Sequence, residues 1–68
     1  MGRLQWIYPN IADACVRRFG SAGRMADALD MEQGYLSELM RGRHEPTKPF
    51  IDKLLAATGL TCEEAFKK

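Results

Sequence analysis

Apolar side chains recur along this chain at the spacing of helix turns, and short polar or glycine-containing stretches separate the segments that carry them. In the first segment these positions are Ile11, Ala12, Cys15, Val16 and Phe19. Intervals of three and four residues put such side chains on one side of a helix. The pattern predicts a helix over 10–19, with Asn10 as its N-cap and Gly20 directly after its end.

Two shorter amphipathic segments follow, and both are bounded by residues that suit helix ends. Ser21 is a favourable N-cap for a helix over 21–29. A third helix is predicted over 32–41, since Gly42 follows it and helices commonly end at glycine. The apolar positions of the two segments are Met25, Ala26, Leu29, Tyr35, Leu36, Leu39 and Met40. Each helix therefore has one side to bury and one side left for solvent.

The last third of the chain contains two further helix starts. Thr47 is a good N-cap and predicts a helix over 48–58. Thr61 and Glu64 match a capping box, in which each side chain binds the other residue's backbone N–H, and they predict a helix over 62–67. No segment alternates with the two-residue period of a strand. The sequence therefore predicts an all-α fold, a compact domain of five helices.

The first residues are apolar but do not read as a helix, because Pro9 interrupts them. We expect residues 1–9 to be an N-terminal arm and residues 10–68 to be the domain. An extended arm, a short helical turn and part of a dimer interface all fit this arm. Its apolar residues are Leu4, Trp6, Ile7 and Tyr8.

The connection between the second and third helices is the most informative feature of the chain. Only about three residues, Asp30 to Glu32, join them, so the two helices must cross steeply. Ala26 is expected to face that crossing, where a larger side chain would push the helices apart, and Met31 is expected to fill the turn. Two helices joined in this way form a helix-turn-helix, which leaves one face of the third helix exposed.

The residues around this turn match a known family. The segment reads Met25-Ala26-x-x-Leu29-Asp30-Met31-x-x-x-x-Leu36-Ser37-x-Leu39-x-x-Gly42, followed by Pro46. This ungapped pattern resembles that of the Cro and lambda-repressor-like helix-turn-helix domains, and the likeness covers about residues 10–66. One departure is Asp30, where the family usually has glycine. Aspartate tolerates left-handed backbone better than most residues, so the turn is expected to survive.

The resemblance implies a function as well as a lambda-repressor-like fold. It implies a sequence-specific transcriptional regulator, a repressor of phage or mobile-element type, that reads the major groove of double-stranded DNA with its third helix. The antitoxin of a toxin–antitoxin pair is an alternative, since such domains share this fold. We also expect a homodimer on a palindromic operator, because one recognition helix spans few base pairs. The apolar residues expected at its interface are Trp6, Ile7 and Phe66.

The resemblance further implies which residues read bases. Gln33, the first exposed residue of the third helix, can pair with the N7 and N6 edge of adenine. Gly34 aligns with a second base-facing position, where it either lets DNA approach closely or is simply tolerated in a first turn. Glu38 aligns with a third, where it either accepts from a cytosine amino group or is a solvated acid paired with Arg41.

The expected phosphate contacts lie on both sides of these positions. Ser21 and Arg24 stand at the start of the second helix, an end that favours anions. Tyr35 is expected either to contact a phosphate or to lie at the edge of the core. On the other side of the third helix, the expected phosphate contacts are Arg41, Arg43, His44 and Lys48. An alternative for this last group is a solvated polar loop.

Charge and composition limit the remaining possibilities. The net charge of the 68-residue chain is only +1, so the local patch, and not the bulk charge, indicates nucleic acid. The acids Glu32 and Glu38 near the recognition helix favour a different class of function, a protein-interaction module that has kept the fold without DNA binding.

The residue types that carry catalysis or bind metals are sparse in this chain. Cys15 and Cys62 are far apart, form no CxxC pair and are accompanied by a single histidine, so we expect free thiols, a cytoplasmic location and no metal site. No nucleophile or acid pair has an organised partner. We therefore expect a protein that is not an enzyme and has no cofactor.

Overall fold

The structure, a computed structural model, describes residues 6–68. Its helical segments are α1 (Pro9–Ala14), the π-helical η1 (Cys15–Phe19), α2 (Ala22–Ala28), α3 (Gln33–Met40), α4 (Lys48–Thr58) and α5 (Cys62–Ala65). Because α1 continues directly into η1, residues 6–68 form five helices and contain no strand, which confirms the predicted all-α fold. None of these helices combines the length and the apolar character that crossing a membrane would require.

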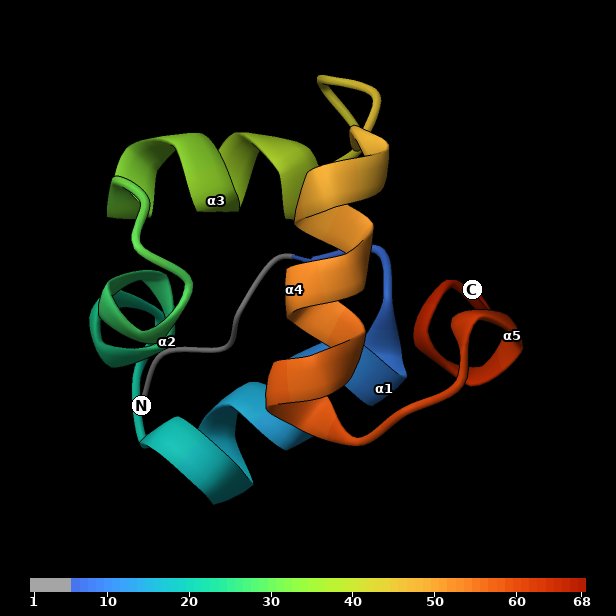
Figure 1. The fold of residues 1–68 in the computed structure, drawn as a ribbon, viewed down its shortest axis with the longest axis horizontal. Coiled ribbons are helices and arrows are strands. Elements are labelled where there is room, and N and C mark those ends of the chain that lie inside the picture. Colours follow the sequence, from blue (N-terminus) through green and yellow to red (C-terminus); the bar gives the residue numbers. More distant parts are fainter. Residues whose placement is uncertain (1–5) are drawn as a thin grey trace.

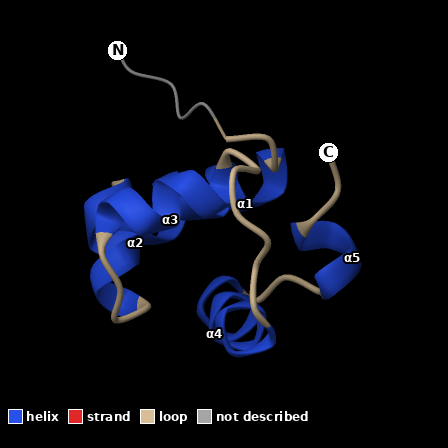
Figure 2. Ribbon diagram, turned by 90° about the horizontal axis from the view of Figure 1, so that it is seen from above, coloured by secondary structure: helices blue, strands red, loops and turns tan. Residues whose placement is uncertain are grey.

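The helices surround one small core. Figure 1 shows α4 upright in the centre, with α3 across its upper end, η1 across its lower end, and α2 between them at the left. Seen from above, α4 is end-on and α5 lies on the side away from α2 and α3 (Figure 2). The largest fully buried side chains are Ile11, Cys15, Met25, Leu36, Leu39, Met40 and Leu54. The third helix therefore lies along one edge of the molecule and has only one face against the core.

The first helix differs from the prediction at its start. It begins at Pro9, and Tyr8 is its N-cap residue. Proline suits this position, because its fixed φ is helical and its missing N–H would have no partner there. Asn10, predicted to be the N-cap, instead donates a hydrogen bond of 2.8 Å from Nδ2 to the backbone oxygen of Glu64, and so links α1 to α5.

The end of the first helix also differs, because its last turn is π-helical. The N–H of Gly20 donates to the oxygen of Cys15 at 3.0 Å, a bond that spans five residues in place of four. The wider turn rotates the side chains relative to an α-helix. Val16, predicted to lie on the buried stripe, is 57% exposed, whereas Phe19 packs against the core.

The tight turn between the second and third helices is confirmed. The backbone N–H of Met31 donates to the backbone oxygen of Ala26 at 3.0 Å, and that of Asp30 donates to the backbone oxygen of Asp27 at 3.1 Å. This pair of bonds is a Schellman motif, which requires a left-handed residue. Asp30 has that conformation, with φ of 57°. Ala26 is 1% exposed at the crossing, as predicted.

The predicted caps of the other helices are present. Ser21 accepts from the N–H of Arg24 at 3.2 Å, Thr47 caps α4, and Thr61 forms the capping box with Glu64. The second and third helices are one residue shorter at each end than predicted. Ser21 and Glu32 are their N-cap residues, and Leu29 and Arg41 are their C-cap residues.

The last helix is shorter than predicted and ends at Ala65 in place of residue 67. Phe66 leaves the helix and packs edge-to-face on Tyr8, with 5.1 Å between the ring centroids. A tertiary contact between the two ends of the chain therefore replaces the last helical turn.

The start of the chain packs more closely than an arm would. Tyr8 belongs to the hydrophobic core, Trp6 packs against it, and the N–H of Ile7 donates to Met40 at 3.0 Å. Trp6 and Phe66, predicted to be exposed at a dimer interface, are partly buried in their own core, and of that group only Ile7 is exposed. The remaining residues of the predicted arm, 1–5, lie outside the described residues.

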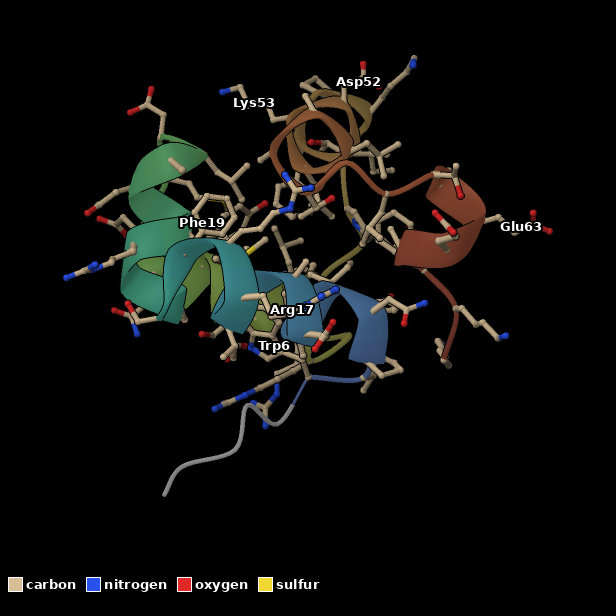
Figure 3. The ribbon with its side chains drawn as sticks, turned by 90° about the horizontal axis from the view of Figure 1, so that it is seen from below. Trp6, Arg17, Phe19, Asp52, Lys53 and Glu63 are labelled. Carbon is tan, nitrogen blue, oxygen red and sulfur yellow. The ribbon has the colours of Figure 1, made fainter. Side chains whose placement is uncertain are left out.

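The face away from α3 is formed by α1, η1 and the C-terminal end of α4 (Figure 1). Figure 3 looks at the molecule from below and shows Arg17 on this face, with Asp52, Lys53 and Glu63 projecting outward from α4 and α5. Arg17 pairs with Asp13 one turn earlier, at 2.9 Å. This ion pair lies at the opposite end of the molecule from the predicted DNA-binding helix.

Candidate nucleic-acid interface

The first turn of α3 is open to solvent. Gln33, Gly34 and Tyr35 are all exposed, whereas the side chains that hold the helix in place, Leu36 and Leu39, are fully buried. Apart from the two chain neighbours of Gly34 and the backbone of its own helix, no atom lies within 4 Å of the position that a Cβ on Gly34 would occupy. This end of the helix can therefore be approached closely from outside.

The start of α2 lies beside the start of α3. A Cβ on Gly23 would lie 3.2 Å from Oε1 of Gln33 and 3.9 Å from Oγ of Ser21. The missing side chain at Gly23 gives the Gln33 amide room to lie against the first turn of α2. The structure thus brings together Ser21 and Gln33, which were predicted to bind a phosphate and a base respectively. Arg24 is exposed on the same turn of α2.

The end of α3 turns back on itself at Gly42. The backbone N–H of Arg43 donates to the backbone oxygen of Glu38 at 3.0 Å, and that of Gly42 donates to the backbone oxygen of Leu39 at 3.1 Å. These two bonds form a second Schellman motif. Gly42 is left-handed, with φ of 81°. In a Schellman motif the two residues at the positions of Glu38 and Arg43 usually make a hydrophobic contact. In this protein the two residues are an acid and a base.

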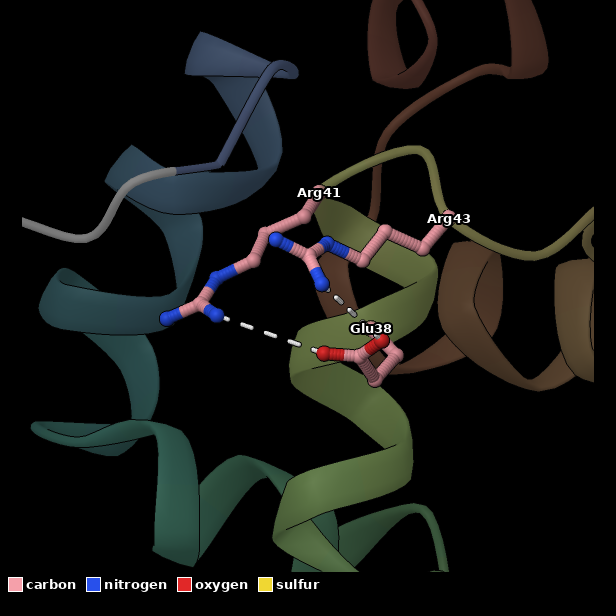
Figure 4. Close-up of polar contacts among 3 residues, drawn as sticks. All are labelled: Glu38, Arg41 and Arg43. Atoms are coloured by element: carbon pink, nitrogen blue, oxygen red, sulfur yellow. Dashed lines mark ion pairs between the residues drawn. The ribbon is translucent and has the colours of Figure 1, made fainter.

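Glu38 lies between two guanidinium groups (Figure 4). Its Oε2 is 4.0 Å from Nη1 of Arg41, and its Oε1 is 4.0 Å from Nη1 of Arg43. The side chain of Glu38 is 36% exposed, that of Arg41 41% and that of Arg43 65%. Ion pairs with this exposure are weak individually and can be exchanged for other partners. The predicted alternative for Glu38, an acid paired with Arg41, is therefore present, with Arg43 as a second partner.

The other predicted phosphate contacts lie around the end of α3. Tyr35 is 45% exposed, so it is not at the core edge, and its ring centroid is 5.8 Å from that of His44. Lys48 begins α4, which starts beside the end of α3 (Figure 1). Its Nζ is 3.5 Å from Oδ1 of Asp52, and both side chains are well exposed.

Sequence reasoning missed one residue of the exposed face. Ser37 is half-buried, and helical spacing puts it one turn after Gln33 and one turn before Arg41. The four-residue interval from Gln33 is the signal that could have found it. A hydroxyl at this position can donate to or accept from either a base edge or a phosphate.

Two other chemical features lie away from this face. Cys15 is a buried free thiol whose pKa is raised by desolvation, so it is a poor nucleophile, and Cys62 is free and exposed on α5. A polar hollow of about 390 Å³ lies between α1, η1 and the turn into α5. Its lining includes Arg17, Arg18 and Gly59 but none of the predicted DNA contacts. Within residues 6–68, no three side chains of the metal-binding types come together.

Comparison with known proteins adds no relative to this picture. No protein-family model matches the chain, and no curated protein matches it. The resemblance to the Cro and lambda-repressor-like domains therefore stays a prediction based on the motif residues.

Proposed function

We propose that this protein is a sequence-specific transcriptional regulator that reads the major groove of double-stranded DNA with α3. The observation that carries the proposal is the position of this helix, held at the edge of the molecule by α2 with its first turn exposed. A helix inserted in the major groove needs such an open face, with its N-terminal residues directed to the bases.

The proposed base contacts come from that first turn. The side-chain amide of Gln33 offers a donor and an acceptor that match the edge of adenine. Gly34, with open space around its α-carbon, allows the helix axis to come close to the base edges. Ser37 continues the same face by one helical turn.

The proposed phosphate contacts flank the bases on both sides. Ser21 and Arg24 at the start of α2 meet one DNA strand, and the basic residues near the end of α3 meet the other. This second set consists of Arg41, Arg43, His44 and Lys48, with Tyr35 beside His44. Backbone contacts of this kind fix the position of a recognition helix without reading sequence.

A dimer and a cytoplasmic location complete the proposal. Two copies on a palindromic operator would place their recognition helices about 34 Å apart, one turn of DNA. Such a protein would repress transcription where it covers a promoter. The two free thiols support a reducing compartment.

The proposal is tested by selecting binding sites from a library of random duplexes with the full chain at low salt. We expect enrichment of one short sequence in inverted repeats, with half-site centres about 10 base pairs apart. Binding without any enriched sequence would contradict the proposed role of α3.

One observation favours a protein-interaction module as a second candidate. Three of the basic residues proposed for phosphates have acidic neighbours, Glu38 for the two arginines and Asp52 for Lys48. A surface with its charges balanced in this way suits a protein partner. This candidate would be favoured if the selection above recovered no duplex at low salt.

A further inference from the structure

We propose that Glu38 is an internal substitute for a DNA phosphate, which pairs with Arg41 and Arg43 until DNA draws the two arginines away from it and thereby weakens the binding of DNA phosphates. This inference rests on the proposed function for the identity of its ligand, a phosphodiester. It concerns a different property, the affinity for the phosphate backbone.

The geometry of the cluster is that of an anion site. Two guanidinium groups approach one carboxylate, and each lies 4.0 Å from a different oxygen (Figure 4). A phosphate also presents separate oxygens to two guanidinium groups, and arginine is well suited to bind it. At 4.0 Å the contacts are longer than charge-assisted hydrogen bonds, so each arginine still has its donors available for a closer anion.

The fold holds this arrangement in place. The left-handed turn at Gly42 returns the chain so that Arg43 lies over Glu38, while Arg41 stands three residues further along the helix than Glu38. The two arginines are at least as exposed as the acid, so both can swing outward to meet a phosphate. The free protein therefore presents two cations and one anion here, a local charge of about +1 in place of +2.

This local charge lowers the affinity for the phosphates of any DNA, and random sequence shows the effect most directly. Random sequence is bound almost entirely through phosphates, and its affinity depends on how many cations are available. A preferred site adds base contacts from Gln33 that do not depend on Glu38. Loss of the carboxylate should therefore strengthen binding to random DNA, where the phosphate contacts act alone.

The test compares Glu38→Gln, which keeps the shape and removes the charge, with the unmodified protein. The two probes are a labelled duplex of random sequence and heparin, a polyanion without bases. Breaking two exposed ion pairs predicts about two- to thirty-fold tighter binding to the random duplex. The local gain of one positive charge predicts a salt slope steeper by up to about one per protomer, and elution from heparin at higher salt.

Asp13→Asn is the matched control. It changes the net charge by the same amount and also releases an arginine, Arg17, from an ion pair of 2.9 Å, but on the face away from α3. We expect less than about a two-fold change with this variant, because its arginine lies outside the proposed interface. Equal effects of the two substitutions would overturn the inference and leave only net charge as the cause.

A second comparison isolates the two arginines. In a background that carries both Arg41→Gln and Arg43→Gln, Glu38→Gln should no longer strengthen binding to either probe. An unchanged gain in that background would overturn the inference, since Glu38 would then act only by repelling DNA. The heparin probe separates this inference from the proposed function: a gain on heparin supports the anion site even if no preferred duplex exists. Conversely, a preferred duplex with no gain on either probe rejects the inference alone.

Discussion

Two residues with left-handed backbone decide how α3 is held, and they differ in how well their side chains suit that conformation. Asp30 ends α2 and Gly42 ends α3, each within a Schellman motif. Glycine adopts positive φ without steric cost, whereas other residues lose roughly 1 kcal/mol or more. Asp30 is the one residue other than glycine with positive φ in residues 6–68.

Asp30→Gly should therefore stabilise the protein. Relief of the left-handed strain, less the added freedom of the unfolded chain, predicts a gain of up to about 1 kcal/mol in the free energy of unfolding. Ala28→Gly is the control: it introduces the same residue at an exposed helical position of α2, where glycine costs about 1 kcal/mol. Urea denaturation measures both, and a loss of stability with Asp30→Gly would mean that its side chain stabilises the turn.

Gly42→Ala should destabilise the protein for two reasons. The backbone has φ of 81°, and a Cβ would lie only 2.9 Å from Cδ1 of Ile7. We expect a loss of about 1–3 kcal/mol. Gly34→Ala makes the same change in open helical space and should be stabilising by up to about 1 kcal/mol. If thermal melting showed the same sign for both variants, the turn at the end of α3 would be placed wrongly.

At the scale of elements, the crossing of α2 and α3 determines which face of α3 is exposed. Ala26 is 1% exposed at this crossing, and the turn at Asp30 allows the helices to approach closely. The packing of the two helices is thus set by one small side chain and one backbone conformation.

Ala26→Phe should overfill this crossing and reduce the free energy of unfolding by roughly 1–3 kcal/mol. Ala28→Phe places the same ring at an exposed position of the same helix and should change stability little. The comparison is made by thermal unfolding followed by circular dichroism. Equal melting temperatures for Ala26→Phe and the unmodified protein would show that the helices do not meet at this residue.

The helices were predictable because their signals are local. Ser21, Thr47 and Thr61 cap their helices as expected, and caps depend only on residues within one turn. The early end of α5 was not predictable, since it depends on a contact between distant segments, and helical periodicity gave no signal for the π-helical turn at η1. Phe66 leaves its helix to pack on Tyr8, a residue at the other end of the chain.

The candidate site was predictable to a similar extent. Helical periodicity predicted that Gln33 and Gly34 are exposed, and both are. The position of Glu38 between Arg41 and Arg43 was only half predicted, because Arg43 reaches it through the turn at Gly42 and not through helical spacing. A C-terminal glycine predicts the end of a helix, whereas the side chains it brings together depend on the whole motif.

At the scale of the whole molecule, positive and negative side chains nearly cancel. The chain has ten lysines and arginines against nine acids, so steering toward DNA must come from local groups. If Arg24, Arg41, Arg43 and Lys48 each meet a phosphate, a dimer neutralises about eight, and log K should fall with log salt at a slope near −7. Titration of a labelled duplex over a range of salt concentrations measures this slope. A slope near zero would remove these residues from the interface.

The central claim, that α3 reads DNA sequence, is tested most directly by measuring how two variants bind a selected duplex and a random duplex at one salt concentration. Gln33→Ala should lose roughly 1–3 kcal/mol on the selected duplex and little on the random one, because it removes a base contact. Arg43→Ala should weaken both about equally, because it removes a phosphate contact. If Gln33→Ala keeps the same preferred site with the same margin over random DNA, α3 does not read the sequence through its first turn.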